Sequence, residues 1–217
     1  MKRFVLFDLD NTLLNSDASW HYVLDNKTFK DFGLKVNQQF KKERSGISNY
    51  EAAKLFVKLT GVDKTVDEVY NNWLENMSYC YQNDVTCKKG AKEFLPRLKQ
   101  KGYRIIVVSA TEKFLVEQAL KRFGLDEYIE RIYTETILQS PKRSVEFYGK
   151  VLRKLGTSYK DVFLFEDSIV SLRSAYKMNV DSCALIHEFN KKHKRELKAI
   201  TNLVIKDYTD KRLINIL

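Results

Sequence analysis

The stretch Phe4-Val5-Leu6-Phe7-Asp8-Leu9-Asp10-Asn11-Thr12-Leu13 decides the fold of this chain. Its first residues form a short and nearly continuous apolar run, which is typical of a central strand buried on both faces of a sheet. Side chains two positions apart in an extended segment leave it on the same side, so the carboxylates of Asp8 and Asp10 can face one ligand. The stretch therefore predicts a buried first strand that carries two acidic side chains at its carboxyl end.

Further along the chain, apolar runs alternate with amphipathic segments. The sequence predicts strands at 103–109, around 132–133, at 162–165, at 183–186 and at 203–205. It predicts helices at 88–101, 113–123 and 144–155, and around 172–177. Strands that alternate with helices of about 10 to 15 residues indicate parallel βαβ units. We therefore expect an α/β fold with a doubly wound, Rossmann-like and mostly parallel sheet.

The segment between the first two strands has a different character. Residues 16–84 are polar, helical in period and rich in aromatic side chains, and no convincing strand is predicted among them. We therefore expect an inserted all-helical domain at 16–84, within an α/β core formed by residues 1–15 and 85–217.

Composition excludes several classes of protein. The 217 residues include 38 basic and 28 acidic side chains, and the net charge of +10 raises the concentration of anions near the surface. Cys80, Cys87 and Cys183 form no C-x-x-C pair, which argues against a disulfide framework or a cysteine zinc site and favours a reducing, cytoplasmic location. No stretch approaches the ~20 apolar residues that span a membrane, so we expect a soluble protein.

Polar side chains follow three of the predicted strands. The first strand ends at Asp8 and Asp10, the second in Ser109-Ala110-Thr111 and a later one in Glu166-Asp167-Ser168. In such sheets, ligands bind beyond the carboxyl ends of the strands. The aspartate pair alone is equally compatible with two solvated side chains in a turn. Acidic residues at two strand ends, with a serine and Lys142 nearby, indicate a site for a hard cation and a phosphate.

Four ordered motifs give the chain a resemblance to the haloacid dehalogenase superfamily. They are Asp8-Leu9-Asp10-Asn11-Thr12-Leu13, Ser109 after four apolar residues, Lys142, and Phe165-Glu166-Asp167-Ser168. The resemblance covers essentially the whole chain and is to the phosphoglycolate phosphatase and β-phosphoglucomutase subgroup with a helical cap. It implies that residues 16–84 are a cap domain that closes over the site, excludes water and selects the leaving group.

The resemblance implies a magnesium-dependent phosphatase with a covalent intermediate. Asp8 would attack phosphorus and form an aspartyl-phosphate, while Asp10 would protonate the leaving oxygen and then activate water. Mg²⁺ would be held by Asp8, the main-chain carbonyl of Asp10 and Asp167. The transferring phosphoryl would be bound by Ser109, Ala110 and Lys142.

Some positions depart from the usual motifs of this superfamily. Ser171 stands where many relatives carry glycine or aspartate, which leaves Asp167 as the main acidic ligand of its motif. Arg143 competes with Lys142 for the phosphate-neutralising role, because a proline precedes the lysine here instead of following it. Glu166 is expected to lie outside the direct metal ligands.

Three side chains of the expected cap are candidates for contact with substrate, namely Trp20, His21 and Arg44. Each is also explained by a place on a helix surface or in the core of the cap. Sugar phosphomutases of this family carry a histidine close to this position, but here Trp20 occupies the matching offset and the histidine follows it. A mutase therefore remains the alternative function.

The expected function is hydrolysis of a small phosphomonoester such as a sugar phosphate, a nucleotide monophosphate or phosphoglycolate. A sugar phosphomutase would use the same intermediate. A basic nucleic-acid-binding module is more remote, because the densest basic cluster, at 191–198, lacks a flanking aromatic platform. Dehalogenation is disfavoured because it offers no leaving oxygen for Asp10 to protonate. The sequence leaves the substrate and the oligomeric state open.

Overall fold

The computed structural model describes residues 3–44 and 47–215, and the chain divides into two compact units. One unit holds the residues up to Asn15 together with those from Thr86 onward, and the other runs from Ser16 to Val85. The second boundary lies one residue beyond the expected one.

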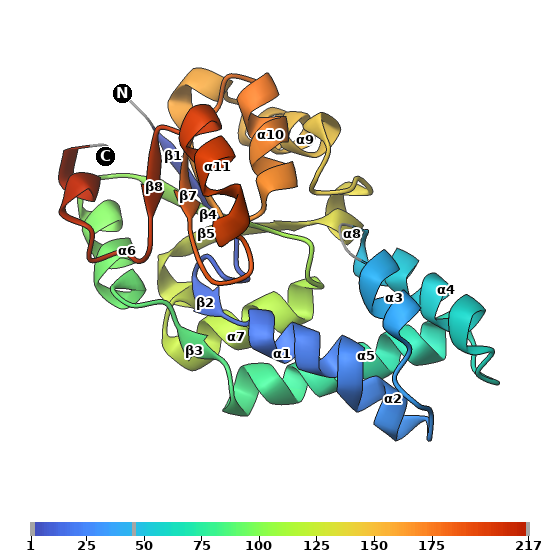
Figure 1. The fold of residues 1–217 in the computed structure, drawn as a ribbon. Coiled ribbons are helices and arrows are strands. Elements are labelled where there is room, and N and C mark those ends of the chain that lie inside the picture. The colour runs from blue at the N-terminus through green and yellow to red at the C-terminus, as the bar shows by residue number, and fades with distance from the viewer. Residues whose placement is uncertain (1–2, 45–46, 216–217) are drawn as a thin grey trace. The chain divides into compact units, whose positions relative to one another are not determined.

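A six-stranded, parallel sheet forms the centre of the first unit, in the order β5-β4-β1-β6-β7-β8 (Figure 1). Its strands are β1 (Phe4–Phe7), β4 (Arg104–Ser109), β5 (Ile129–Thr134), β6 (Val162–Glu166), β7 (Asp181–Leu185) and β8 (Leu203–Ile205). After β1, the chain adds β4 and β5 on one side and then β6, β7 and β8 on the other. The strand order therefore switches between β1 and β6, which confirms the predicted doubly wound α/β fold.

Helices cover both faces of this sheet. One face carries α6 (Ala91–Gln100) and α7 (Lys113–Phe123), and the other carries α9 (Val145–Leu155), α10 (Ile169–Lys177) and α11 (Lys194–Ile200) (Figure 1). The side chains of β1 alternate between the two faces. Phe4 and Leu6 pack in an apolar cluster with residues of α9, whereas the Phe7 ring stacks on Phe165 at 4.7 Å and meets Phe94 of α6. All four residues of β1 are buried, as expected of a strand covered on both faces.

The start of α6 differs from the sequence-based prediction. The pattern predicts a helix from Lys88, but α6 begins at Ala91, because Gly90 has a left-handed φ of 80° that cannot continue a helix. The preceding residues form β3 (Thr86–Cys87), which pairs antiparallel with β2 (Leu14–Asn15) in a small second sheet. The sequence does not predict this ribbon, since strands of two residues carry no periodic signal.

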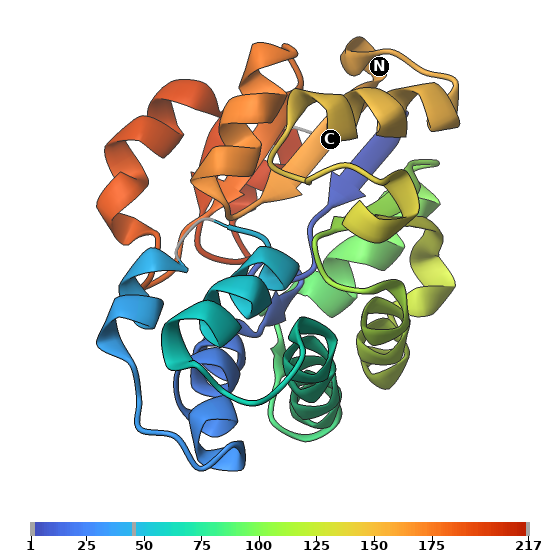
Figure 2. The same cartoon turned by 90° about the vertical axis from the view of Figure 1, so that its right-hand side faces the viewer.

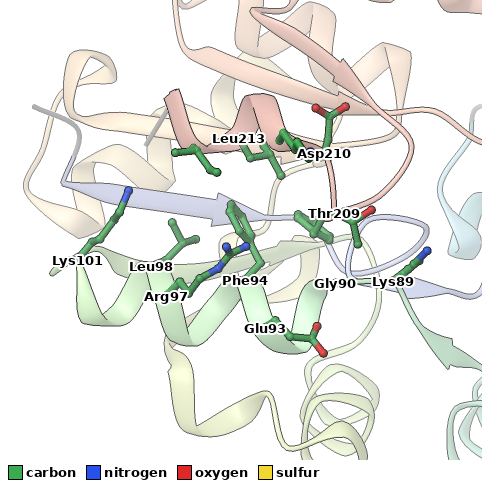
Figure 3. A pocket seen from close by; sticks show the side chains of 13 residues that line it. Lys89, Gly90, Glu93, Phe94, Arg97, Leu98, Lys101, Thr209, Asp210 and Leu213 are labelled. Carbon is green, nitrogen blue, oxygen red and sulfur yellow. The ribbon is translucent and has the colours of Figure 1, made fainter.

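A hollow of about 720 Å³ lies between α6 and the segment that follows β8 (Figure 3). Its lining includes apolar side chains of both segments, such as Phe94, Leu98 and Leu213. The Tyr208 N–H donates to the carbonyl of Lys89 at 3.0 Å and joins the two segments. None of the residues predicted to act in catalysis, phosphate binding or metal binding lines this hollow.

The second unit is built from helices (Figure 2). These helices pack around aromatic rings. Its elements are α1 (Asp17–Tyr22), a π-helical turn η1 (Val23–Lys27), α2 (Thr28–Asp31), α3 (Gln38–Glu43), α4 (Asn49–Thr60) and α5 (Val66–Asn83). The Phe56 ring is central, with the rings of Phe29, Phe40 and Trp73 at 4.8, 5.2 and 6.1 Å. Within 16–44 and 47–85, every assigned element is helical.

Short elements complete the first unit. They are α8 (Glu135–Leu138) and the 3-10 turns η2 (Asp126–Tyr128), η3 (Tyr159–Asp161), η4 (Lys191–His193) and η5 (Lys211–Asn215). Over the part of the chain that the structure describes, none of the helices combines the length and apolar character needed to cross a membrane.

Candidate active site

The carboxyl ends of β1, β4 and β6 lie side by side because these strands are parallel neighbours. Asp8 follows β1, and its N–H continues the sheet by donating to the carbonyl of Phe165 at 3.0 Å. Ser109 is the last residue of β4, and Glu166 is the last residue of β6. The topology therefore gathers these three sequence-predicted side chains at one edge of the sheet.

Lys142 bridges two of the carboxylates at this edge. Its Nζ lies 2.5 Å from Oδ1 of Asp8 and 2.6 Å from Oε2 of Glu166, and all three side chains are buried. The Lys142 N–H donates to Oε1 of Glu135 at 2.6 Å, which fixes the loop between α8 and α9. The lysine thus lies in the loop before α9, and it is Lys142, not Arg143, that contacts Asp8.

Three acidic residues form a cluster that can hold a metal ion. Ligand atoms of Asp8, Glu166 and Asp167 all lie within 4.8 Å of one another. Burial, with the Glu166 carboxylate next in importance, raises the pKa of Asp8 to about 7. Burial also raises the pKa of Glu166 to about 7, against the opposing effect of Lys142. Burial raises the pKa of Asp167 as well. In each case burial disfavours the negatively charged form of the carboxyl group.

Glu166 is held more firmly than the sequence suggests. Its Oε1 accepts hydrogen bonds from the N–H groups of Asp167 and Ser168, at 3.1 and 2.9 Å. Its Oε2 lies in the ion pair with Lys142. Both oxygens already have partners, so Asp8 and Asp167 are better placed than Glu166 to donate an oxygen to a metal.

Asp10 pairs with a residue that sequence reasoning missed. The Thr111 hydroxyl donates to Oδ2 of Asp10 at 2.7 Å, and the Thr111 N–H donates to the hydroxyl of Ser109 at 3.0 Å. Ser109 and Thr111 are buried, whereas Ala110 between them is exposed. The signal was available in the sequence, because Thr111 follows the same strand two positions after Ser109.

His187 and Asn190 are further neighbours that the sequence-based prediction missed. His187 Nε2 lies 2.9 Å from Oδ2 of Asp167, and the Asn190 amide donates to the main-chain carbonyl of Asp167 at 2.9 Å. In the sequence the histidines are too scattered to suggest a site. The position of His187 after β7, a neighbour of β6, is the signal that places this histidine at the same edge of the sheet.

Residues 5–185 match the family profile described as haloacid dehalogenase-like hydrolase. The chain belongs to this family. The matched range contains the ends of β1, β4 and β6 and the Lys142 loop. It therefore includes Asp8, Lys142, Glu166 and Asp167. The family match confirms the predicted superfamily and the prediction of a hydrolase.

Known proteins similar to this haloacid dehalogenase-like hydrolase cover most of its length. A protein of Clostridium perfringens that is named as a pyrophosphatase, PpaX, is 28% identical over 193 residues, which are 85% of this chain and 84% of the relative. The phosphorylated carbohydrates phosphatase of Thermotoga maritima is 18% identical over 187 residues, 86% of either chain. A mutant of CbbY from Rhodobacter sphaeroides, solved with xylulose-(1,5)-bisphosphate, matches in fold with a TM-score of 0.82 and 18% identity, covering 97% of this chain and 96% of that one.

In this haloacid dehalogenase-like hydrolase, the three cap candidates contact other residues of the helical unit. Nε and Nη2 of Arg44 lie 2.6 and 2.7 Å from the two oxygens of Asp25, and Nη2 lies 2.8 Å from Nδ1 of His21. Although burial opposes it, hydrogen bonds from His21 and Arg44 lower the pKa of Asp25 to about 2. Trp20 Nε1 donates to the hydroxyl of Tyr81 at 3.2 Å. These contacts give each candidate a role within its own unit.

Proposed function

We propose that this chain is a magnesium-dependent phosphatase that hydrolyses a small phosphomonoester through an aspartyl-phosphate on Asp8. The observation that carries the proposal is the charge of the buried cluster. Asp8, Glu166 and Asp167 bring three carboxylates together, and Lys142 supplies one ammonium group. The remaining two negative charges match one divalent cation, and a donor set made only of oxygens suits Mg²⁺.

Asp8 and Asp167, with the main-chain carbonyl of Asp10, would hold the metal. Bound there, Mg²⁺ would neutralise the nucleophile and the phosphoryl oxygens. Asp8 attacks phosphorus, and Asp10 gives a proton to the leaving oxygen before taking one from the attacking water. The hydrogen bond from Thr111 to Asp10 fixes the orientation of that carboxyl group.

Phosphoryl binding falls to the side chains at the end of β4 and to Lys142. The Ser109 hydroxyl and the main-chain N–H of Ala110, an exposed residue, offer hydrogen-bond donors, and Lys142 offers a positive charge. Since such charged and polar groups are fixed before the reaction, they stabilise the charge of the transferring group without reorganisation. These roles together describe phosphoryl transfer to water.

The names of related proteins guide the choice of test substrates, and the relative from Clostridium perfringens is named a pyrophosphatase. The name of the Thermotoga maritima relative states a phosphatase for phosphorylated carbohydrates, and the CbbY structure contains a sugar bisphosphate. We therefore begin the search for a substrate with phosphorylated sugars and test pyrophosphate beside them. The helical unit, residues 16–85, is proposed as the cap that selects among them.

The test is phosphate release from a panel of phosphomonoesters, with Mg²⁺ or with EDTA, by wild type and Asp8→Asn. Magnesium-dependent release that disappears in Asp8→Asn is the expected result. No release from any ester, including an aryl phosphate, would overturn the hydrolase proposal. A product carrying the phosphoryl group at a new sugar position would identify a mutase instead.

A matched pair of variants tests the role of the lysine. Lys142→Met removes the charge beside Asp8 and is expected to lower kcat/KM by about 10²- to 10³-fold, as for other groups that stabilise transition-state charge. Arg143→Met is the control in the adjacent position, with a change within about threefold expected, as for the loss of a partly exposed charge. Equal losses in both variants would contradict the assignment of Lys142.

A further inference from the structure

We propose that His187 is a positioning residue that sets the affinity of the site for Mg²⁺ by fixing the carboxylate of Asp167. The inference rests on the proposed function, because it takes Asp167 as a metal ligand. It adds a role for a side chain outside the four motifs, on the loop that follows β7.

The loop brings His187 to the metal cluster from a neighbouring strand. Glu166 at the end of β6 pairs with Ala184 of β7, so the residues that follow the two strands leave the sheet together. His187 Nε2 then lies 2.9 Å from Oδ2 of Asp167, and both side chains are about 15% exposed. The contact is sheltered from water, where a hydrogen bond to a carboxylate is strong.

Asn190 fixes the main chain of the same loop. Its side-chain amide donates to the carbonyls of Asp167 and Leu185 at 2.9 and 2.8 Å, and its Oδ1 accepts from the His187 N–H at 2.9 Å. The side chain is buried. Asn190 therefore joins the end of β6 to the end of β7. It also fixes the main-chain position from which the His187 side chain extends.

The hydrogen bond between His187 and Asp167 has a direct consequence for metal binding. An aspartate that follows a strand can rotate about two side-chain bonds, and only some rotamers direct an oxygen at the ion. A donor on Oδ2 limits that rotation and leaves the other oxygen as an acceptor for the cation. Outer hydrogen bonds of this kind typically change metal affinity by about 10- to 100-fold when they are removed.

Three substitutions separate the hydrogen bond from the bulk of the ring. His187→Phe keeps a ring and removes the donor, so it is expected to weaken Mg²⁺ binding by about 10- to 100-fold. His187→Gln places an amide N–H near the position of Nε2 and is expected to stay within about threefold of wild type, since it keeps the outer hydrogen bond. His187→Asn has a shorter side chain that falls short of Asp167, and it is expected to resemble the Phe variant.

The measurement is Mg²⁺ binding to the full chain by isothermal titration calorimetry, without substrate. In assays, His187→Phe should need a higher Mg²⁺ concentration for half-maximal activity, while kcat at saturating Mg²⁺ stays close to wild type. Its melting temperature in EDTA should match that of wild type, because Asn190 still holds the loop. A purely structural role would instead lower that temperature.

The outcomes distinguish this inference from the proposed function. Wild-type affinity in His187→Phe, or no recovery in His187→Gln, would overturn the role of His187 and leave the phosphatase proposal intact. If wild type itself bound no Mg²⁺, both the phosphatase proposal and the inference would be wrong.

Discussion

The side chains of Asp8 and Glu166 hold protons at a pH where most carboxyl groups are fully ionised. Burial is the main cause for both groups, and it raises the pKa of each to about 7. Around neutral pH, a metal-free molecule therefore carries part of its charge balance as protons on these carboxyls. A divalent cation replaces those protons with a charge that does not depend on pH.

The exchange of protons for metal is measurable. At pH 7, Mg²⁺ binding should release on the order of one proton, and the release should fall towards zero by about pH 9, where both carboxyls are already ionised. Calorimetry in two buffers of different ionisation enthalpy reports the number directly. Asp8→Asn is the control, with a smaller release expected. A binding heat that does not depend on the buffer would contradict the raised pKa values.

The sign of the stability effect follows from the same shifts. Because the pKa of Asp8 and of Glu166 is raised in the folded, metal-free state, their contribution to stability is fully present below their ordinary pKa values near 4. The contribution is lost as pH rises through about 7. In EDTA, these two groups therefore lower the free energy of unfolding between about pH 5 and pH 8, whereas bound Mg²⁺ opposes that loss.

The junction between α6 and the segment that follows β8 depends on a glycine, Gly90. A Cβ on Gly90 would lie 2.9 Å from the main-chain carbon of Tyr208, and its φ is 80°. Gly102, just after α6, has a similar φ of 83° but no heavy atom within 4 Å of such a Cβ. The two glycines thus share the backbone strain of substitution and differ in the space around it.

Comparing the alanine variants of Gly90 and Gly102 isolates the effect of the close contact between residue 90 and the main chain of Tyr208. Gly102→Ala should cost about 1 to 2 kcal/mol, which is the cost of a left-handed alanine. Gly90→Ala should cost about 2 to 4 kcal/mol, because overpacking against the backbone adds to that strain. Urea denaturation of the full chain measures the difference. Equal effects would show that the segment after β8 moves away freely.

The sequence predicts most of the core unit because its strands are apolar runs with polar ends. β1, β4 and β6 are buried on both faces, and that burial is what a continuous apolar run signals. The same logic locates Asp8, Ser109 and Glu166, each beside the end of a strand. Parallel pairing then brings these residues together without information from the loops.

Other features of the structure cannot be predicted from local sequence patterns, and the reasons are physical. The contact between His187 and Asp167 joins residues 20 apart through a loop whose course depends on Asn190. The π-helical turn η1 has no period that distinguishes it from the helices around it. The ion pair of the cap candidate Arg44 with Asp25 spans 19 positions and needs the folded helices.

The net charge of +10 belongs to the whole molecule and attracts or repels every charged ligand that approaches it. A positive protein raises the encounter rate with anions, and salt screens that attraction. The screening length falls from about 30 Å at 0.01 M to about 8 Å at 0.15 M ionic strength. Phosphate esters are dianions near neutral pH, so their capture should depend on salt.

Kinetics at two ionic strengths test this expectation. Raising the ionic strength from about 0.01 to 0.15 M with NaCl, at constant Mg²⁺, should lower kcat/KM roughly 2- to 10-fold for a dianionic ester. The value of kcat is the internal control and should stay nearly constant, because the bound substrate has already been captured. A rise in kcat/KM with salt would contradict electrostatic attraction of the substrate.

The central position of β1 has a consequence for the synthesis of the protein. This strand is made before its partners β4 and β6, which begin at Arg104 and Val162. At roughly 5 to 20 residues per second, a ribosome needs about 5 to 20 s to reach the first partner and about 8 to 30 s to reach the second. During that time, the four apolar side chains of β1 lack the neighbours that later bury them. The nascent chain is therefore vulnerable to misfolding at the strand that becomes the centre of its sheet.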